Sequence, residues 1–311
     1  MKTRHFLSIA DLSKKEIEFL IKKALEIKKN PEKYSQNLRN KTLFMLFEAP
    51  SLRTRVSFEA GMTQLGGHAI YYDIAQSTLG KKESVKDFTK TTERYCDMIM
   101  ARLYDHRQIE EMAANASIPV INAMSNREHP CQILSDLMTI QEKKGALKGK
   151  LAYLGDGLNN TTHSLLLGCS IAGMNIAVAS PKGKDYEPDK KIVAEAKRLA
   201  AKSGSKILIT NDAKEAVESA DVVYTDSWMS YHIPAEQEKE RERIFRPYKV
   251  NVPLMKHAKK NALFMHCLPA KRGQEVTDDV MDSRQSIVFD QAENRMHAQK
   301  ALMLRLAGKI R

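Results

Sequence analysis

The sequence has few cysteines and aromatic residues, and it lacks any long apolar run. Its four cysteines, at positions 96, 131, 169 and 267, form no C-x-x-C pair, which argues against a structural zinc site or a disulfide framework. No apolar run approaches the length of a membrane span. The first residues also lack the apolar stretch of a signal peptide. Together these absences favour a globular protein in a reducing, cytoplasmic compartment.

The charge balance is strongly basic, with 50 lysines and arginines against 38 acidic residues and a formal net charge of +12. Such an excess occurs in proteins that bind nucleic acids or membranes, and it also attracts small anionic substrates. The lysines are spread along the chain, without an aromatic RNA-binding motif or zinc-finger spacing. We therefore expect small anions as partners, and neither nucleic acid nor membrane.

The length and the pattern of apolar runs predict two α/β domains. At 311 residues the chain exceeds the usual size of one domain. From about residue 41, β-like runs alternate with amphipathic helices, which predicts parallel sheets with helices on both faces. A break lies near residues 145–150. We expect two doubly wound parallel-sheet domains with an interdomain cleft, namely residues 1–147 joined by a C-terminal helix at 294–311, and residues 148–293.

The expected elements begin with a helix capped by Asp11 or Ser13. A charged run at 236–246 is typical of a solvated helix face. Tyr153-Leu-Gly-Asp-Gly157 follows an expected strand but lacks the complete G-x-G-x-x-G pattern, which argues against a nicotinamide cofactor. The expected strands are 42–47, 69–72, 98–103, 120–123, 151–154, 176–179, 206–209, 222–225, 263–267 and 287–289.

The most informative motif lies where the first expected strand turns into a helix. Ser51, Arg53, Thr54 and Arg55 occupy this helix start. Helix N-termini carry unpaired N–H groups and a partial positive charge, so hydroxyl and guanidinium groups there form a phosphate site. Ligands of open parallel sheets bind at the carboxyl ends of the strands. A capped helix with surface arginines is the alternative interpretation.

Other polar groups follow the remaining strands of the first half. Arg102 ends an expected strand and adds positive charge at the same edge of the sheet. His129 and Gln132 lie at the start of the next helix, where Pro130 suits the first turn. Together His129 and Gln132 can hydrogen-bond a carbonyl and an adjacent amide, although His129 could instead only cap the helix.

The second half offers groups that suit an amine. Asp226 and Ser230 follow a strand, and a carboxylate with a hydroxyl there suits an ammonium group. His266 and Cys267 close a later strand, where the thiol is either a nucleophile or simply a buried small residue. The residues thus indicate group transfer from a phosphorylated donor to an amine.

A set of ordered motifs resembles the aspartate/ornithine carbamoyltransferase family, especially its ornithine branch, over nearly the whole length. The resemblance implies one domain for carbamoyl phosphate, one for the amino acid, a homotrimer or a multiple of trimers with sites between subunits, and neither metal nor other cofactor. The motifs are Ser51-Leu-Arg-Thr-Arg55, Leu65-Gly-Gly-His68, Leu79-Gly-Lys-Lys-Glu-Ser84, His129-Pro-Cys-Gln132, Gly155-Asp-Gly-Leu-Asn-Asn160, His266-Cys-Leu-Pro-Ala270 and Glu293-Asn-Arg295.

The resemblance also implies a role for individual residues. Arg102, His129, Asp226 and Cys267 would be catalytic. L-Ornithine would be bound by Asn160, Asp226, Ser230 and Tyr231. Carbamoyl phosphate would be bound by Ser51, Leu52, Arg53, Thr54, Thr78, Arg102, His129, Gln132, Cys267, Leu268 and Arg295.

The implied activity is carbamoyl transfer from carbamoyl phosphate to the δ-amine of L-ornithine, giving L-citrulline and phosphate in arginine biosynthesis, or the catabolic reverse. The family's ornithine loop usually continues Ser-Met-Gly, whereas this chain has Ser230-Tyr-His232. A sibling transferase for putrescine or an acylated ornithine is therefore an alternative, followed by a non-catalytic anion-binding paralogue. Thr78 also replaces a usual glutamine, so the cross-subunit contact of that glutamine with carbamoyl phosphate would be either lost or taken by Lys81 or Lys82.

Overall fold

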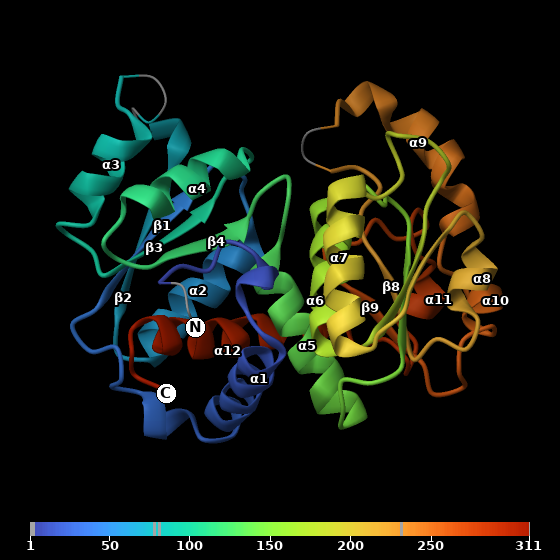
Figure 1. The fold of residues 1–311 in the computed structure, drawn as a ribbon, viewed down its shortest axis with the longest axis horizontal. Helices are drawn as coiled ribbons and strands as arrows, with labels where there is room; N and C mark the ends of the chain where they lie inside the picture. The colour runs from blue at the N-terminus through green and yellow to red at the C-terminus, as the bar shows by residue number, and fades with distance from the viewer. Residues whose placement is uncertain (1–3, 77–78, 80–81, 231–232, 311) are drawn as a thin grey trace. The chain divides into compact units, whose positions relative to one another are not determined.

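The computed structural model describes residues 4–76, 79, 82–230 and 233–310, and the chain divides into two compact units (Figure 1). Unit 1 comprises Met1–Glu142 and Glu293–Arg311, and unit 2 comprises Lys143–Ala292. Each unit contains one parallel sheet. The prediction of two parallel-sheet α/β domains is therefore confirmed.

Unit 1 is built on four parallel strands in the order β2-β1-β3-β4. Their apolar runs are continuous because both faces of the inner strands are covered. Phe44 and Leu46 of β1 pack with Phe88 of α3 and Ile109 of α4, while the alternate residue Met45 is also fully buried. The strands are β1 Thr42–Phe47, β2 His68–Asp73, β3 Met98–Arg102 and β4 Val120–Met124.

Helices from both ends of the sequence complete unit 1. In Figure 1 the blue α1 lies beside the red α12, and Lys28 Nζ of α1 donates to Asn294 Oδ1 of α12 over 2.9 Å. Ser13, rather than Asp11, caps α1 in a capping box with Glu16. The helices are η1 Ile9–Asp11, α1 Lys14–Lys29, η2 Pro31–Tyr34, α2 Leu52–Gln64, η3 Ile74–Gln76, α3 Val85–Thr92, α4 His106–Asn115, α5 Pro130–Lys144 and α12 Val288–Leu306.

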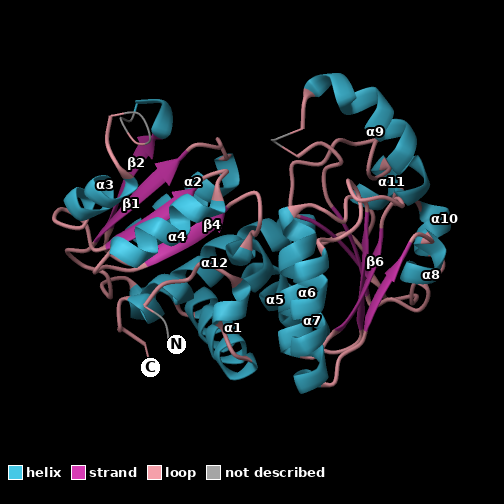
Figure 2. Cartoon of the chain, turned by 45° about the horizontal axis from the view of Figure 1, so that its top comes forward, coloured by secondary structure: helices cyan, strands magenta, loops and turns pink. Residues whose placement is uncertain are grey.

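Unit 2 is built on five parallel strands in the order β7-β6-β5-β8-β9. Figure 2 shows helices α6 and α7 beside this sheet, and α8, α10 and α11 on its other side. The strands are β5 Lys150–Leu154, β6 Asn175–Ala179, β7 Ile207–Thr210, β8 Val222–Thr225 and β9 Leu263–His266. The helices are α6 Asn160–Ala172, α7 Lys190–Ser203, α8 Ala213–Val217, η4 Ala235–Gln237, α9 Glu238–Phe245, η5 Arg246–Tyr248, α10 Val252–Met255 and α11 Asp278–Met281.

One expected strand, 287–289, is wrong. Val288 begins α12, and Gln291 N already donates to Ile287 O over 2.9 Å, as in a helix. Only an isolated bridge between Ser286 and Phe264 joins this segment to β9. The three apolar residues are too few to decide between strand and helix, and the residues after them continue the helix. The other expected strands are present, with each end within one residue of its expected position.

The two glycines after β5 serve close packing. Gly155 has a φ of 131°, in the region that favours glycine, and a Cβ there would lie 3.4 Å from Trp228 Nε1. A Cβ on Gly157 would lie 2.6 Å from the backbone oxygen of Tyr186. Backbone approach within the unit therefore accounts for the glycine pair. Among the residues that the structure describes, no helix combines the length and apolarity that crossing a membrane requires.

Candidate functional site

The candidate site of unit 1 lies where its sheet reverses strand order. The chain goes from β1 to β2 on one side and returns to β3 on the other, so the carboxyl ends of β1 and β3 are neighbours. Phe47 at the end of β1 is paired with Arg102 at the end of β3. Such reversal points are where open α/β sheets bind ligands. The sheet therefore brings the start of α2 next to Arg102.

Ser51 is the N-cap of α2, and its Oγ accepts a hydrogen bond from the N–H of Thr54 over 3.2 Å. Capping leaves other N–H groups of the first turn without helical partners, and the helix dipole adds positive potential there. The backbone of Leu52 and Arg53 lies in this first turn. These groups lie at the helix start where the sequence predicts a phosphate site.

Thr54 is the residue on which the other side chains of this site converge. Its hydroxyl oxygen lies 3.2 Å from Ser51 Oγ, 3.5 Å from Arg102 Nη1 and 3.3 Å from Arg295 Nη2. Thr54, Arg102 and Arg295 are almost completely buried. Two guanidinium groups thus share one buried hydroxyl at the start of a helix, an arrangement that favours an anion.

Arg102 and Arg295 are held in place by further hydrogen bonds. Arg102 Nε donates to the backbone oxygen of Ala49 over 3.0 Å. Arg295 Nη1 donates to Gln132 Oε1 over 2.5 Å, and Gln132 Nε2 donates to Asp136 Oδ1 over 2.8 Å. Predicted residues from α2, β3, α5 and α12 therefore meet in one hydrogen-bonded group.

His129 precedes α5 and is buried near the two arginines. Burial is the main cause that lowers its pKa well below the ordinary value, and the charges of Arg295 and Arg102 lower it further. The imidazole is therefore neutral at physiological pH. A neutral imidazole has one ring N–H, which can donate a hydrogen bond to a carbonyl oxygen.

The remaining members of the first motif lie nearer the surface. Arg53 is half-buried, and the side chain of Leu52 is 73% exposed. Arg55 turns away from Thr54: its Nε lies 3.2 Å from Glu59 Oε2, and its guanidinium lies over the ring of Tyr71. An i,i+4 ion pair thus places the Arg55 side chain along the surface of α2, apart from the group around Thr54.

The candidate site of unit 2 also lies at a reversal of strand order, between β5 and β8. Asp226 follows β8, and its Oδ1 accepts hydrogen bonds from Cys267 Sγ and from the N–H of Ser227, over 2.9 and 2.8 Å. Its other oxygen accepts from Asn159 Nδ2 over 3.1 Å. The predicted Asp226 and Cys267 are thus in direct contact.

Asn159 is a residue that the sequence reasoning missed in favour of Asn160. Asn159 caps α6 through its Oδ1, which accepts from the N–H of Thr162 over 2.9 Å. Asn160 is the first residue of that helix and is half-buried. An asparagine just before a helix is a capping signal, but capping alone does not indicate contact with Asp226.

His266 is positioned differently from the expected partner of a nucleophilic thiol. Its Nδ1 accepts from the N–H of Leu268 over 2.9 Å, and its Nε2 lies 3.3 Å from Glu275 Oε1. Potential metal-ligating atoms of Asp226, His266 and Cys267 lie within 4.8 Å of one another. Because both ring nitrogens of His266 are engaged, the imidazole is poorly suited either to ligate a metal or to activate the thiol.

Arg241 was missed because it lies in the charged run that was expected to be solvated. Arg241 is instead buried in α9, where its Nη2 lies 2.5 Å from Asp156 Oδ2 and its Nε donates to the backbone oxygen of Trp228 over 2.7 Å. Trp228 in turn stacks on Phe245. Arg241 therefore connects the turn after β5 to the loop after β8.

Burial raises the pKa of Asp156 to about 6, although the nearby charge of Arg241 lowers it.

Ser230 is half-buried, and its backbone oxygen accepts from the N–H of Ile233 over 3.0 Å. Thr78, Lys81 and Tyr231, for which roles are predicted, and His232, which departs from the family pattern, lie outside the described residues.

Comparisons with known proteins agree along the full chain. The family model of the aspartate/ornithine carbamoyltransferase carbamoyl-P binding domain matches residues 4–142, and that of the Asp/Orn binding domain matches residues 148–306. An ornithine carbamoyltransferase of Anoxybacillus flavithermus is 50% identical over 98% of this chain and 97% of its own length. The solved ornithine carbamoyltransferase of Pyrococcus furiosus is 47% identical, covers 99% of this chain and 98% of its own, and superposes with a TM-score of 0.93.

Replacement of Arg241 by alanine should lower the free energy of unfolding by about 3–5 kcal/mol, because it leaves the Asp156 carboxylate buried without its counter-charge. Denaturant titration measures this loss. Arg243→Ala, on the exposed side of the same helix, is the matched control and should change stability by less than about 0.5 kcal/mol. Equal effects of the two substitutions would contradict the role of the buried pair.

Proposed function

The chain belongs to the aspartate/ornithine carbamoyltransferase family, and we propose that it transfers the carbamoyl group of carbamoyl phosphate to the δ-amine of L-ornithine. The products are L-citrulline and phosphate. The observation that carries this proposal is the convergence of Arg102, Arg295 and Ser51 on Thr54 at the start of α2. Two guanidiniums, two hydroxyls and a helix N-terminus suit a phosphate that carries a second polar group.

Unit 1 is the proposed binder of carbamoyl phosphate. Its phosphate would lie against the first turn of α2, where Ser51, Leu52, Arg53 and Thr54 offer hydroxyl, guanidinium and backbone N–H donors. The carbamoyl part would form hydrogen bonds with the neutral His129 and with the group formed by Gln132 and Arg295. Support comes from the carbamoyl-P binding domain model, which matches residues 4–142.

Unit 2 is the proposed binder of L-ornithine. Asp226, Ser230 and Asn160 would hold the α-amino and α-carboxyl groups, and Cys267 would lie near the attacking amine. We add Asn159 to this group because it donates to Asp226 and thereby fixes the orientation of the carboxylate. The Asp/Orn binding domain model, which matches residues 148–306, supports this assignment.

In the proposed reaction the neutral δ-amine attacks the carbamoyl carbon, and the C–O bond to phosphate breaks. Negative charge that develops on the carbamoyl oxygen is stabilised by hydrogen bonds from Arg102, His129 and Thr54. The electron pair of the broken bond leaves with phosphate onto the N-terminus of α2. The amine loses one proton, which the phosphate dianion or the Cys267 environment accepts. Side chains and backbone dipoles supply the stabilising charge, so the proposal involves no cofactor.

We also propose that the protein assembles as a homotrimer or a multiple of trimers. The exposed apolar side chains Leu52 and Val56 of α2 and Ile70 of the edge strand β2 support an interface on unit 1. The four free thiols fit the reducing cytoplasm that we propose as the compartment.

Phosphate release should require both carbamoyl phosphate and L-ornithine, because neither half-site alone completes the transfer. A panel of amines tests this requirement by colorimetric phosphate assay, with citrulline measured in parallel. Turnover with putrescine or an acylated ornithine, and none with L-ornithine, would contradict the proposed substrate. Carbamoyl phosphate without amine is the control for spontaneous hydrolysis.

Arg102→Ala should lower kcat by about 10²–10³-fold, since it removes a donor to the developing oxyanion. Arg102→Lys should recover only part of the rate, because an ammonium lacks the planar fork of a guanidinium. Steady-state kinetics measure both variants. Arg107→Ala, whose exposed side chain pairs with Asp105, is the matched control. A wild-type rate in Arg102→Ala would remove Arg102 from the proposed mechanism.

Light scattering of the purified protein should give a mass of about three chains or a multiple of three, because the exposed apolar residues of α2 and β2 need a partner surface. Val56→Glu should shift the mass toward the monomer by placing a charge in that interface. Tyr95→Glu, at another exposed site, serves as the control. A monomeric wild-type protein would overturn the proposed assembly.

A further inference from the structure

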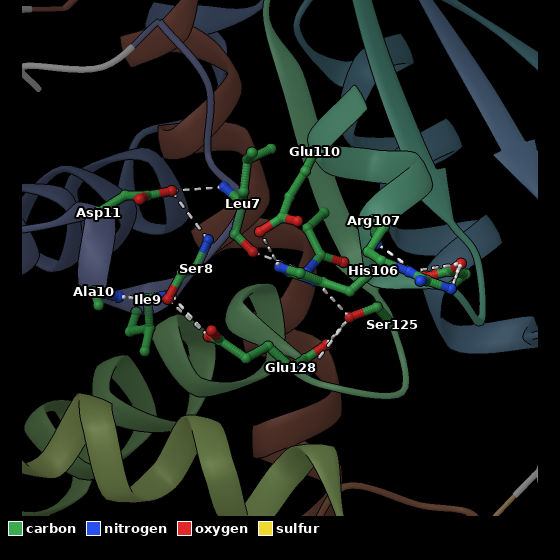
Figure 3. A network of polar contacts seen from close by, with 12 residues as sticks. Leu7, Ser8, Ile9, Ala10, Asp11, His106, Arg107, Glu110, Ser125 and Glu128 are labelled. Atoms are coloured by element: carbon green, nitrogen blue, oxygen red, sulfur yellow. Dashed lines mark hydrogen bonds and ion pairs between the residues drawn. The ribbon is translucent and has the colours of Figure 1, made fainter. Parts of the chain in front are cut away.

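A four-residue turn, 125–128, directly precedes His129. The N–H of Ser125 donates to the backbone oxygen of Glu128 over 2.8 Å, and the N–H of Glu128 donates to Ser125 Oγ over 3.2 Å. His106 Nδ1 of α4 lies 2.8 Å from the same hydroxyl (Figure 3). Two hydrogen bonds between its first and last residues therefore close the turn. Its last residue, Glu128, determines the position of the adjoining His129.

The side chain of Glu128 connects this turn to the N-terminal segment. Its Oε2 accepts from Ser8 Oγ over 2.9 Å and lies 3.4 Å from the N–H of Ile9 (Figure 3). Glu128 is only 3% exposed. A buried carboxyl group thus joins η1 to the residue before His129, across about 120 positions of sequence.

The N-terminal segment that contacts Glu128 is itself held in place by hydrogen bonds. Asp11 Oδ2 accepts from the N–H groups of Leu7 and Ser8 over 2.7 and 3.0 Å. Phe6 is fully buried and exchanges backbone hydrogen bonds with both Val120 and Asn122 of β4. The η1 segment is consequently a rigid support rather than a loose terminus.

We propose that Glu128 is a positioning residue for the transfer reaction. Its contact with Ser8 and Ile9 fixes the turn that precedes His129, and thereby the position from which His129 donates a hydrogen bond to the carbamoyl group. The inference rests on the proposed function, and it concerns a residue that acts through His129 without touching substrate. No contact of Glu128 with the phosphate-binding residues is needed.

The ionisation of Glu128 makes this role measurable. Burial raises its pKa to about 7, while the bonds from Ser8 and Ile9 and the charge of Arg127 lower it and the charge of Asp11 raises it. On α4, His106 contacts Ser125 of the turn and pairs with Glu110, and burial lowers the pKa of His106. Hydrogen bonds to a carboxylate are stronger than those to a neutral acid. The turn should therefore be held more tightly above about pH 7 than below it.

The contribution of Glu128 to folding stability should change in the opposite direction and decrease as pH rises. The folded-state pKa of Glu128 is raised above its ordinary value, so the folded protein binds the proton more tightly than the unfolded chain. The stability that this group contributes is complete below about pH 4.5 and is lost as pH rises through about 7. If Glu128 were only structural, activity would follow this loss.

The test compares Glu128→Gln with the wild-type protein across pH. The amide keeps the shape and an acceptor oxygen but cannot ionise, so kcat of the two should agree within about twofold near pH 6. We expect the variant to be at least about threefold slower near pH 8.5, with the change centred close to pH 7. Glu111→Gln, at an exposed position of α4, is the matched control and should follow the wild-type profile.

Three results would overturn the inference: a ratio of the two kcat values that does not vary with pH, a variant that is faster than wild type at high pH, or a KM for ornithine that changes as much as kcat. An inactive wild-type protein would instead contradict the proposed function. Ser8→Ala supplies an independent check. Its effect on kcat at high pH should be much smaller in the Glu128→Gln background than in the wild type, because both substitutions weaken the same contact.

Discussion

The reversal of strand order within each parallel sheet is the constraint on which both candidate half-sites depend. In unit 1 it makes the ends of β1 and β3 neighbours, and in unit 2 it does the same for β5 and β8. Helices that cover both faces leave the carboxyl edge as the place where polar side chains can gather without disrupting a core. Arg102 ends β3 and Asp226 directly follows β8, so each lies at such a point.

The two buried arginine charges explain why the group around Thr54 is held rigidly as well as being positive. Burying two guanidiniums is costly unless their N–H groups find acceptors. Ala49, Thr54 and Gln132 supply oxygen acceptors, and Asp136 fixes the amide of Gln132. Burial, together with the same positive charges, lowers the pKa of His129 and keeps the imidazole neutral. The donors are therefore in place before a substrate arrives, which is the condition for effective stabilisation of a developing oxyanion.

Both half-sites are supported by buried carboxyl groups that were not among the predicted site residues. Asp156 with Arg241 holds the loops that precede Asn159 and follow β8. Glu128 holds the turn that precedes His129. These carboxyls contact a guanidinium, a serine hydroxyl and backbone N–H groups, so their influence on the chemistry is exerted through the position of other residues.

The α/β class, nearly all strands and the motifs that mark the family follow from the amino-acid sequence alone, because apolar periodicity and helix-start residues are local signals. The strand at 287–289 was wrong because three apolar residues satisfy either periodicity. Only the tertiary structure showed that Arg55 turns away, that Asn159 reaches Asp226, and that Arg241 and Glu128 are buried in polar contacts. The contacts of Asn159, Arg241 and Glu128 depend on residues far apart in the chain, and spacing along a sequence carries no information about which distant side chains the packing of helices on a sheet brings together.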